Sequence, residues 1–273
     1  MTILVTGATG NVGGAIIHEL VERGARVRAM TRNPARARLP EEVEVVPGDF
    51  GDPDSLASAF AGAKALHLIN YDAKSGAHMK NPETVVALAK AAGIERVTSF
   101  RGEAPGALEQ ALRQSGLAWT DFFIPVEFMT NALQWAQSVA TEGVVRAFGP
   151  SRSAMIHEAD IGTAIANALT AVGHAGKSYT LTGPEALTPQ DKVDALCETT
   201  GKAIRLIELS EAEARAKWQA LGTPAPFIEF LVDWHVNTPE SAYQVLPTVE
   251  QLTGCLPRTF RQWAFERAAA FRG

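Results

Sequence analysis

A glycine-rich segment near the N-terminus is the first feature of the sequence that could bind a ligand. Gly7-Ala8-Thr9-Gly10-Asn11-Val12-Gly13 lies between a short apolar run, Thr2 to Thr6, and apolar residues at helical spacing. Between a strand and a helix, glycines allow a tight turn, close approach of backbone to a pyrophosphate, and close helix packing. The alternative is a glycine-rich turn without a ligand. The placement favours dinucleotide binding, with these contact residues: Gly7, Thr9, Gly10, Asn11, Val12 and Gly13.

The end of the second predicted strand, Arg26 to Thr31, bears on which nicotinamide dinucleotide is bound. An acidic residue there accepts a hydrogen bond from the ribose 2′-hydroxyl, whereas an arginine neutralises a 2′-phosphate. The chain has Arg32 at this point, and the segment from Arg23 to Arg38 contains six arginines and no carboxylate. These residues favour NADP(H), with NAD(H) as the alternative. A solvated basic face would explain the same run without a cofactor.

Further short motifs follow the G-x-x-G-x-x-G loop in a fixed order. They are Thr31-Arg32-Asn33-Pro34, Gly48-Asp49-Phe50, Ser115-Gly116-Leu117-Ala118-Trp119-Thr120, Pro125-Val126-Glu127-Phe128-Met129-Thr130-Asn131, Asp160-Ile161 and Thr253-Gly254. In this order they resemble the NmrA-like branch of the atypical short-chain dehydrogenase/reductases, which includes NAD(P)H:quinone oxidoreductases. The resemblance covers nearly the whole chain. It implies that Asp49 lies near the adenine amine and Phe50 against the adenine ring, although a turn aspartate and a core phenylalanine would explain both residues equally well.

The residue that donates a proton during reduction is not evident from the sequence. Ordinary short-chain reductases use a Tyr four residues before a Lys, and this pair is absent here, as it commonly is in the NmrA-like branch. Ligands of open α/β sheets bind outside the carboxyl ends of the strands. Asn70 and Tyr71 follow the predicted fourth strand and could line the nicotinamide ribose, which makes Tyr71 the first candidate acid. Thr98 and Ser99, on the fifth strand, are the other candidates, unless they are strand hydroxyls bonded to backbone.

The second half of the chain is the predicted substrate side. The resemblance places His157 near the substrate pocket, although a surface or capping role would also explain it. The family's Arg-Pro before the aromatic-Met-x-Asn motif is replaced by the apolar Phe122-Phe123-Ile124-Pro125. We therefore expect an apolar pocket with Phe128, Met129 and Trp135 as contacts, or else as core residues. Further aromatic candidates are Phe148, Trp218, Phe227, Phe230 and Trp234.

Alternating strand and helix patterns predict the fold class, an α/β protein with a Rossmann-type doubly wound parallel sheet and a smaller C-terminal substrate-side region. The predicted strands are 2–6, 26–31, 43–46, 65–70, 96–100 and 119–124, and the predicted helices are 54–60, 82–92, 105–115, 160–172, 189–200 and 258–271. His67 lies inside an apolar run, which indicates a core histidine rather than a general base. We place the cofactor-binding core at residues 1–125 and the substrate-binding region at 126–273. Strands near 178–182 and 203–209 are expected to return the chain to the main sheet.

Composition narrows the classes of protein further. The chain has 273 residues, 25 Lys and Arg against 30 Asp and Glu, and a net charge of −5. Nucleic acid is therefore not expected as the main ligand. No apolar run reaches the roughly 18 residues of a membrane span, so no membrane partner is expected. The two cysteines, Cys197 and Cys255, form no metal motif or disulfide framework, which indicates a reducing cytoplasm and no metal site.

These features together predict an NAD(P)H-dependent oxidoreductase that passes a hydride to a small aromatic molecule, a quinone or an aromatic carbonyl, polyketide-like carbonyls included. Two alternatives stay open. A non-catalytic NmrA-like regulator would bind the dinucleotide, sense redox state and contact a protein partner. A tailoring enzyme would use the cofactor to oxygenate or isomerise an aromatic polyketide. The sequence leaves the oligomeric state open, a homo-oligomer included.

Overall fold

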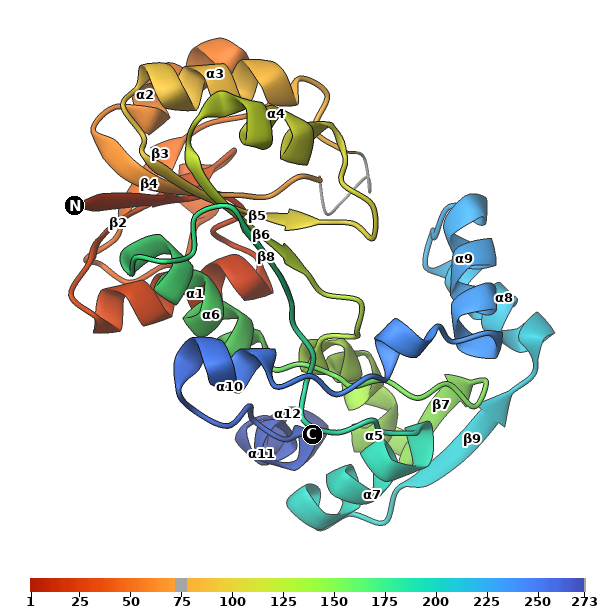
Figure 1. The fold of residues 1–273 in the computed structure, drawn as a ribbon. Coiled ribbons are helices and arrows are strands. Elements are labelled where there is room, and N and C mark those ends of the chain that lie inside the picture. The colour runs from red at the N-terminus through yellow and green to blue at the C-terminus, as the bar shows by residue number, and fades with distance from the viewer. Residues whose placement is uncertain (72–77, 273) are drawn as a thin grey trace. The chain divides into compact units, whose positions relative to one another are not determined.

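Seven parallel strands form the main sheet of the protein (Figure 1). The computed structural model describes residues 1–71 and 78–272. Their contacts divide the chain into two compact units. Unit 1 contains Met1–Ile124, Glu158–Leu181 and Thr248–Gly254, and unit 2 contains Pro125–His157, Thr182–Pro247 and Cys255–Gly273. Unit 1 therefore consists of three separate stretches of sequence.

The main sheet lies entirely in unit 1, in the order β3-β2-β1-β4-β5-β6-β8. Its strands are β1 (Thr2–Val5), β2 (Arg26–Thr31), β3 (Glu44–Pro47), β4 (Ala63–Leu68), β5 (Arg96–Arg101), β6 (Ala118–Phe123) and β8 (Lys177–Thr180). The order reverses direction between β1 and β4, which is the switch point where doubly wound sheets bind ligands. The predicted Rossmann-type class is confirmed.

Helices cover both faces of this sheet, which explains why its central strands β1 and β4 are buried along most of their length. One face carries α1 (Asn11–Glu22), α6 (Glu158–Thr170) and α10 (Thr248–Thr253). Of these, α6 contacts both α1 and α10. The other carries α2 (Pro53–Phe60), α3 (Pro82–Ala91) and α4 (Ala107–Ser115) (Figure 1). The apolar stripe predicted for α1 is buried at Ile16 and Leu20, and the helix ends before Gly24, whose φ of +71° suits glycine.

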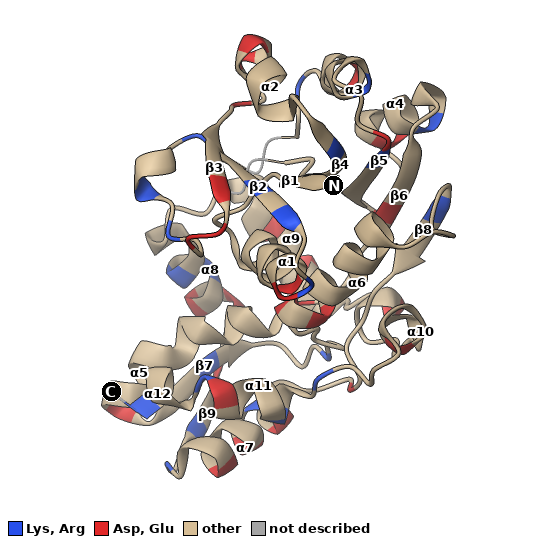
Figure 2. Ribbon diagram, turned by 90° about the vertical axis from the view of Figure 1, so that its left-hand side faces the viewer, with Lys and Arg blue, Asp and Glu red and all other residues tan. Residues whose placement is uncertain are grey.

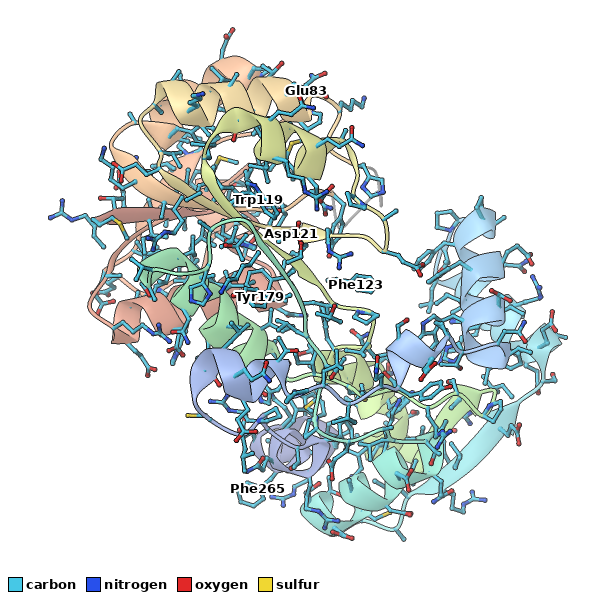
Figure 3. All side chains as sticks on the ribbon, in the orientation of Figure 1. Glu83, Trp119, Asp121, Phe123, Tyr179 and Phe265 are labelled. Atoms are coloured by element: carbon cyan, nitrogen blue, oxygen red, sulfur yellow. The ribbon has the colours of Figure 1, made fainter. Side chains whose placement is uncertain are left out.

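A buried carboxylate stabilises the end of the sheet formed by β5 and β6. Trp119, Asp121 and Phe123 alternate along β6 and so project from the same face (Figure 3). Asp121 is 1% exposed and pairs with Arg101 (Nε–Oδ1, 3.1 Å) and Arg113 (Nη2–Oδ2, 3.4 Å). Arg101 also donates to the carbonyls of Gly102 and Glu103, so the same ion pair fixes the loop after β5.

Unit 2 has a smaller parallel pair of strands, β7 (Val144–Phe148) and β9 (Arg205–Leu209). Its helices are η2 (Met129–Trp135), α5 (Ala136–Glu142), α7 (Pro189–Thr200), α8 (Glu211–Ala220), α9 (Ala225–Val236), η3 (Glu240–Ala242), α11 (Phe260–Glu266) and α12 (Ala268–Arg272). Trp263, Phe260 and Phe271 dominate its core. α7 begins with a capping box between Thr188 and Asp191 and is followed by Gly201 at a φ of +71°.

The predicted strands and helices of residues 1–124 are confirmed to within a few residues at each end. In the second half, the strand expected near residue 178 is β8, which pairs with β6. The strand expected near residue 203 is β9, and it pairs with β7 rather than with the main sheet. Sequence periodicity did not predict β7, α5, α8 or α9, and the helix expected over 258–271 is interrupted at Arg267.

His67 is a core residue of β4, as predicted. Its side chain is fully buried, its Nδ1 lies 2.9 Å from Thr98 Oγ1, and its ring packs edge-on against Phe100. The other ring nitrogen, Nε2, has no hydrogen-bond partner among residues 1–71 and 78–272. Burial lowers the pKa of His67 to about 3, so the folded protein holds the neutral imidazole.

We therefore expect His67 to make stability depend on pH. Its pKa is about 6.5 when unfolded and about 3 when folded, so its contribution is complete above pH 6.5 and is lost as the pH falls toward 3. Within this window the free energy of unfolding should fall by up to about 1.4 kcal/mol per pH unit. Urea unfolding at several pH values should show this slope in the parent and in His18→Gln, an exposed control. An equal slope in His67→Gln would contradict the assignment.

Candidate functional site

The glycine loop joins β1 to α1 in the way that a phosphate-binding turn requires. Gly7 has a φ of +62°, and the N–H of Gly10 donates to the Gly7 carbonyl at 2.9 Å, which closes the turn. Helix α1 begins at Asn11, with Gly10 as the N-cap residue. Because glycine has no side chain to accept from the first helical N–H groups, these groups and the positive end of the helix dipole can receive an anion.

Two glycines of the loop leave no space for a side chain. A Cβ on Gly13 would lie 2.1 Å from the carbonyl oxygen of Gly7 and 2.7 Å from its carbonyl carbon. A Cβ on Gly7 would lie 2.8 Å from Ile69 Cγ2. Helix α1 therefore packs directly on the turn, with backbone against backbone. The loop fits the diphosphate of a dinucleotide, for which such close packing and bare N–H groups are the structural requirements.

The ends of β1 and β4 are joined at the switch point. Thr6 Oγ1 donates to the carbonyl of His67 (2.8 Å) and accepts from the N–H of Ile69 (2.9 Å). Ile69 lies against Gly7 of the glycine loop, and the next residue, Asn70, is 9% exposed. The structure thus brings together the predicted cofactor residues of the loop and of the fourth strand.

The arginine run divides into two groups in the structure. Arg23 pairs with Glu19 (2.6 Å) and Arg28 with Glu44 (2.9 Å), so these two are engaged along the body of unit 1. Arg32 follows the last residue of β2 and is exposed at the carboxyl edge of the sheet. Arg36 and Arg38 come next, and Arg32 to Arg38 includes no acidic residue (Figure 2). A phosphate at the end of β2 would therefore meet positive charge.

Asp49 and Phe50 follow β3, beside the end of β2, where the Gly48 N–H donates to the Thr31 carbonyl at 3.1 Å. Asp49 Oδ1 accepts from the N–H of Gly51 at 2.9 Å, and Phe50 packs against the core between the sheet and α2. The aspartate therefore stabilises its own turn, and the phenylalanine is partly a core residue. Adenine contact by the two residues stays a prediction.

The candidate acids differ in exposure. Tyr71 is 42% exposed at the end of β4, where it forms an isolated bridge with His78. Thr98 and Ser99 are fully buried, and Thr98 is bonded to His67. Ser99 Oγ has no partner within the described part of the chain. Only Tyr71 among the three is therefore exposed, and proton donation by any of them stays a prediction.

The predicted substrate residues all lie in unit 2. Met129 is 1% exposed and belongs to the core, and Phe128 pairs through a backbone bridge with Ile156. His157 is 3% exposed, and its Nε2 lies 3.3 Å from Glu266 Oε2. Trp135 is 8% exposed and is the one of the four that lines a described cavity. Substrate contact by these four residues stays a prediction.

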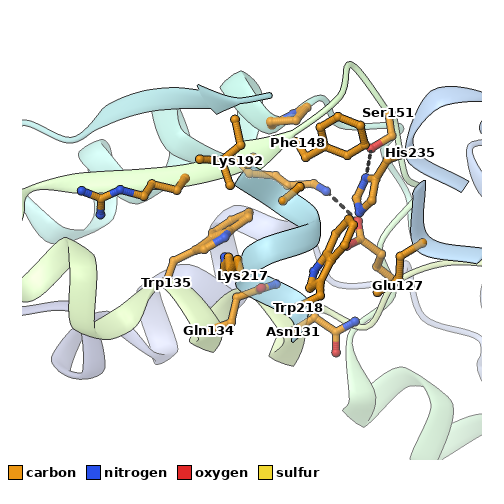
Figure 4. Close-up of a pocket in the computed structure, with 16 residues that line it drawn as sticks. Glu127, Asn131, Gln134, Trp135, Phe148, Ser151, Lys192, Lys217, Trp218 and His235 are labelled. Carbon is orange, nitrogen blue, oxygen red and sulfur yellow. Dashed lines mark hydrogen bonds and ion pairs between the residues drawn. The ribbon is translucent and has the colours of Figure 1, made fainter. Parts of the chain in front are cut away.

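That cavity, of about 310 Å³, lies wholly within unit 2 (Figure 4). Of the aromatic candidates, Phe148 and Trp218 line it together with Trp135. Trp218 stacks on His235 with ring centroids 6.0 Å apart, and Phe148 meets both rings edge-on. The sequence did not identify the polar lining of this cavity as site residues: Glu127, Asn131, Gln134, Arg146, Ser151, Lys192, Lys217 and His235.

Hydrogen bonds and burial set the charges in the cavity. Lys192 Nζ lies 2.7 Å from Glu127 Oε2, and Ser151 Oγ lies 2.8 Å from His235 Nδ1 (Figure 4). Burial is the main cause that lowers the pKa of His235, so the neutral imidazole is favoured. Burial, followed by the charge of Arg146, also lowers the pKa of Lys217.

The sequence did contain a signal for helix α8. Ser210 and Glu213 form a capping box at its start, before Lys217 and Trp218.

The parallel sheet and the glycine loop at its switch point define a nicotinamide dinucleotide-binding protein of the Rossmann type. A family model described as NAD(P)H-binding matches residues 7–102. The (4-alkanoyl-5-oxo-2,5-dihydrofuran-3-yl)methyl phosphate reductase of Streptomyces griseus is 36% identical, over 98% of this chain and 99% of the relative. The chain belongs to the NmrA-like, quinone oxidoreductase-like branch of the atypical short-chain dehydrogenase/reductases.

Two further relatives agree over the full length. The NAD(P)H azoreductase of Xenophilus azovorans is 29% identical over 98% of this chain and 99% of that protein. The structure of NADPH-dependent quinone oxidoreductase from Escherichia coli, complexed with NADPH, superposes with a TM-score of 0.79 at 27% identity, covering 97% of this chain and 99% of the other. The protein is thus an NAD(P)H-dependent oxidoreductase that acts on a small molecule. None of its described helices has the length and apolar character needed to span a bilayer.

The close packing at Gly13 gives a direct test of the glycine loop. Gly13→Ala should destabilise the protein by about 2–3 kcal/mol, because the new methyl group meets backbone that cannot move aside cheaply. It should also weaken NADPH binding, because the turn must open. Gly14→Ala is the matched control, since a Cβ there has nothing within 4 Å. That variant should be neutral or up to about 1 kcal/mol more stable. Thermal unfolding and fluorescence titration with NADPH measure both effects, and equal behaviour of the two variants would refute the packing constraint.

Proposed function

We propose that the protein uses NADPH to reduce a quinone or an aromatic carbonyl compound. The observation that carries this proposal is the glycine loop, whose bare N–H groups and side-chain-free contact with α1 fit a diphosphate at the switch point. The nicotinamide, when bound, supplies the hydride. In this proposal unit 1 binds the cofactor, and unit 2 contributes the residues that bind the substrate.

Charge at the end of β2 supports NADP(H) over NAD(H). Arg32 stands where a 2′-OH-binding carboxylate would stand in an NAD-specific protein, and Arg36 and Arg38 extend the positive segment. A guanidinium group has paired donors that match phosphate oxygens. Arg32 would therefore hold the 2′-phosphate of the adenosine ribose.

The chain's own residues would act mainly by binding and orientation. Asn70, the residue after Ile69, would bind the nicotinamide ribose, and Tyr71 would donate a proton to the oxygen of the acceptor. Holding two reactants in position lowers a barrier by roughly 7–11 kcal/mol in favourable cases. Quinones need little acid assistance, so an enzyme without the Tyr/Lys pair is suited to them.

A flat aromatic substrate agrees with the aromatic side chains of unit 2. Trp135, Phe148 and Trp218 line one cavity there, and aromatic walls favour planar ligands. The names of the relatives, a quinone oxidoreductase and an azoreductase among them, support the same class of acceptor. Among the described residues Cys197 is a free cysteine, which supports a reducing compartment such as the cytoplasm.

One observation favours the alternative of a regulator. Phe227 and Phe230 on α9 stack on each other and are 52% and 54% exposed, and exposed apolar surface is what a protein partner would bind. The full-length similarity to named reductases favours catalysis instead. Oxygenation or isomerisation of a polyketide has no observation of its own in its favour.

The overall test of the proposed function is oxidation of NADPH and NADH with a panel of quinones and aromatic ketones. No oxidation with any acceptor would refute the proposal.

If Arg32 binds the 2′-phosphate, Arg32→Glu should weaken NADPH binding more than tenfold while sparing or improving NADH binding. Arg26→Glu is the control, because it makes the same charge change at the exposed opposite end of β2. Fluorescence titration with both cofactors measures the preference. Equal affinity of the parent protein for NADPH and NADH would reject the assignment.

If Tyr71 is the acid, Tyr71→Phe should lower kcat about a hundredfold for an aromatic ketone, and less for a quinone, with cofactor affinity unchanged. The control is Tyr179→Phe. Tyr179 lies on β8, and its phenol is hydrogen-bonded to His174. Steady-state kinetics with both acceptors separate the two effects. An unaltered kcat with the ketone would eliminate Tyr71.

A further inference from the structure

The cavity of unit 2 contains more positive than negative charge. Its lining includes Lys192, Lys217 and Arg146, but Glu127 is the one carboxylate among the described lining residues. Arg146 is neutralised from outside the cavity, because both of its terminal nitrogens contact the carboxylate of Glu142, at 2.6 and 3.2 Å. Lys192 is neutralised from inside, by Glu127 at 2.7 Å.

Among the residues that the structure describes, Lys217 is left without a counter-ion. Its side chain is partly buried on α8, and no hydrogen bond or ion pair of its Nζ occurs within residues 1–71 and 78–272. Nearby carboxylates are already engaged: Glu213 accepts from Ser210, and Glu127 pairs with Lys192. A partly desolvated ammonium group is costly unless an anion compensates it. Burial and the charge of Arg146 lower the pKa of Lys217 accordingly, and a bound anion would reverse this effect.

The remaining lining suits a phosphate group attached to a planar molecule. Asn131 and Gln134 on η2 add amide N–H donors to the ammonium of Lys217, and phosphate oxygens accept several such bonds at once. Trp218, stacked on His235, and Trp135 supply aromatic walls. The volume of about 310 Å³ suits a ligand at the small end of the usual range.

We propose that this cavity binds the phosphate monoester group of a small conjugated substrate, with Lys217 as the residue that determines specificity for the anion. The identity of the occupant as substrate rests on the proposed function. The Streptomyces griseus relative is named as the reductase of a methyl phosphate ester of an unsaturated lactone, which supports this class of ligand. Lys217 would therefore separate phosphorylated acceptors from neutral quinones.

Calorimetry on the full chain saturated with NADP+ tests the proposal without turnover, and the bound cofactor blocks phosphate binding at the glycine loop. The probes are a short-chain (4-alkanoyl-5-oxo-2,5-dihydrofuran-3-yl)methyl phosphate and the alcohol obtained by removing its phosphate. The phosphate should bind at least tenfold more tightly than the alcohol. Lys217→Met should abolish this difference, and Lys217→Arg should retain most of it. Lys177→Met, an exposed lysine of β8, is the control and should keep the full difference.

Two results would overturn the inference: equal affinity of the parent protein for the phosphate and the alcohol, or undiminished phosphate affinity in Lys217→Met. Both are distinguishable from failure of the proposed function. NADPH oxidation by neutral quinones is measured separately, on the parent protein. A protein that oxidises NADPH with quinones but ignores the phosphate would keep the proposed function and lose this inference.

Discussion

The contact between Gly13 and the carbonyl group of Gly7 is the constraint on which the geometry of the glycine loop, the candidate cofactor site, depends. At that point the first helix lies so close to the turn that even a methyl group would overlap backbone. The same proximity directs the first N–H groups of α1 at whatever occupies the turn, because the helix axis starts there. Gly7 adds a second contact, with Ile69 at the end of β4. Strand, turn and helix are thus fixed by backbone contacts, and the Ile69 side chain adds the neighbouring strand.

Local patterns predicted unit 1 well and unit 2 only in part, and the difference has a physical basis. The central strands of the main sheet, β1 and β4, are buried on both faces, so they are short apolar runs next to helices with clear apolar stripes. β7 and β9 pair across about sixty residues of sequence. The sequence predicted β9 but neither β7 nor the pairing of the two, because a pairing between distant segments leaves no local signature. Helix α9 exposes Phe227 and Phe230, so its apolar residues do not form one buried stripe. Such elements depend on tertiary contacts that periodicity does not record.

The candidate site shows the same limit at the level of single residues. Position relative to a strand end predicted that the glycine loop, Arg32 and Asn70 lie at the carboxyl ends of β1, β2 and β4, and the structure places them there. Position along the sequence did not predict that Thr98 and Ser99 are fully buried, or that Met129 belongs to the core of unit 2. The lysines of the unit 2 cavity, Lys192 and Lys217, were not predicted as site residues because neither lies in a recognisable sequence motif. Lys217 becomes unusual only when the neighbouring carboxylates prove to be occupied.

The division of unit 1 into three stretches has a consequence for how the protein is made. During synthesis, β1 to β6 emerge first, then a part of unit 2, and only afterwards α6 and β8. Helix α1 cannot bury its contacts with α6 until residue 170 has left the ribosome, and α10 arrives later still. A nascent chain halted near residue 125 would therefore carry an uncovered sheet face and an unpaired strand edge at β6, which are the features that chaperones recognise and that promote aggregation.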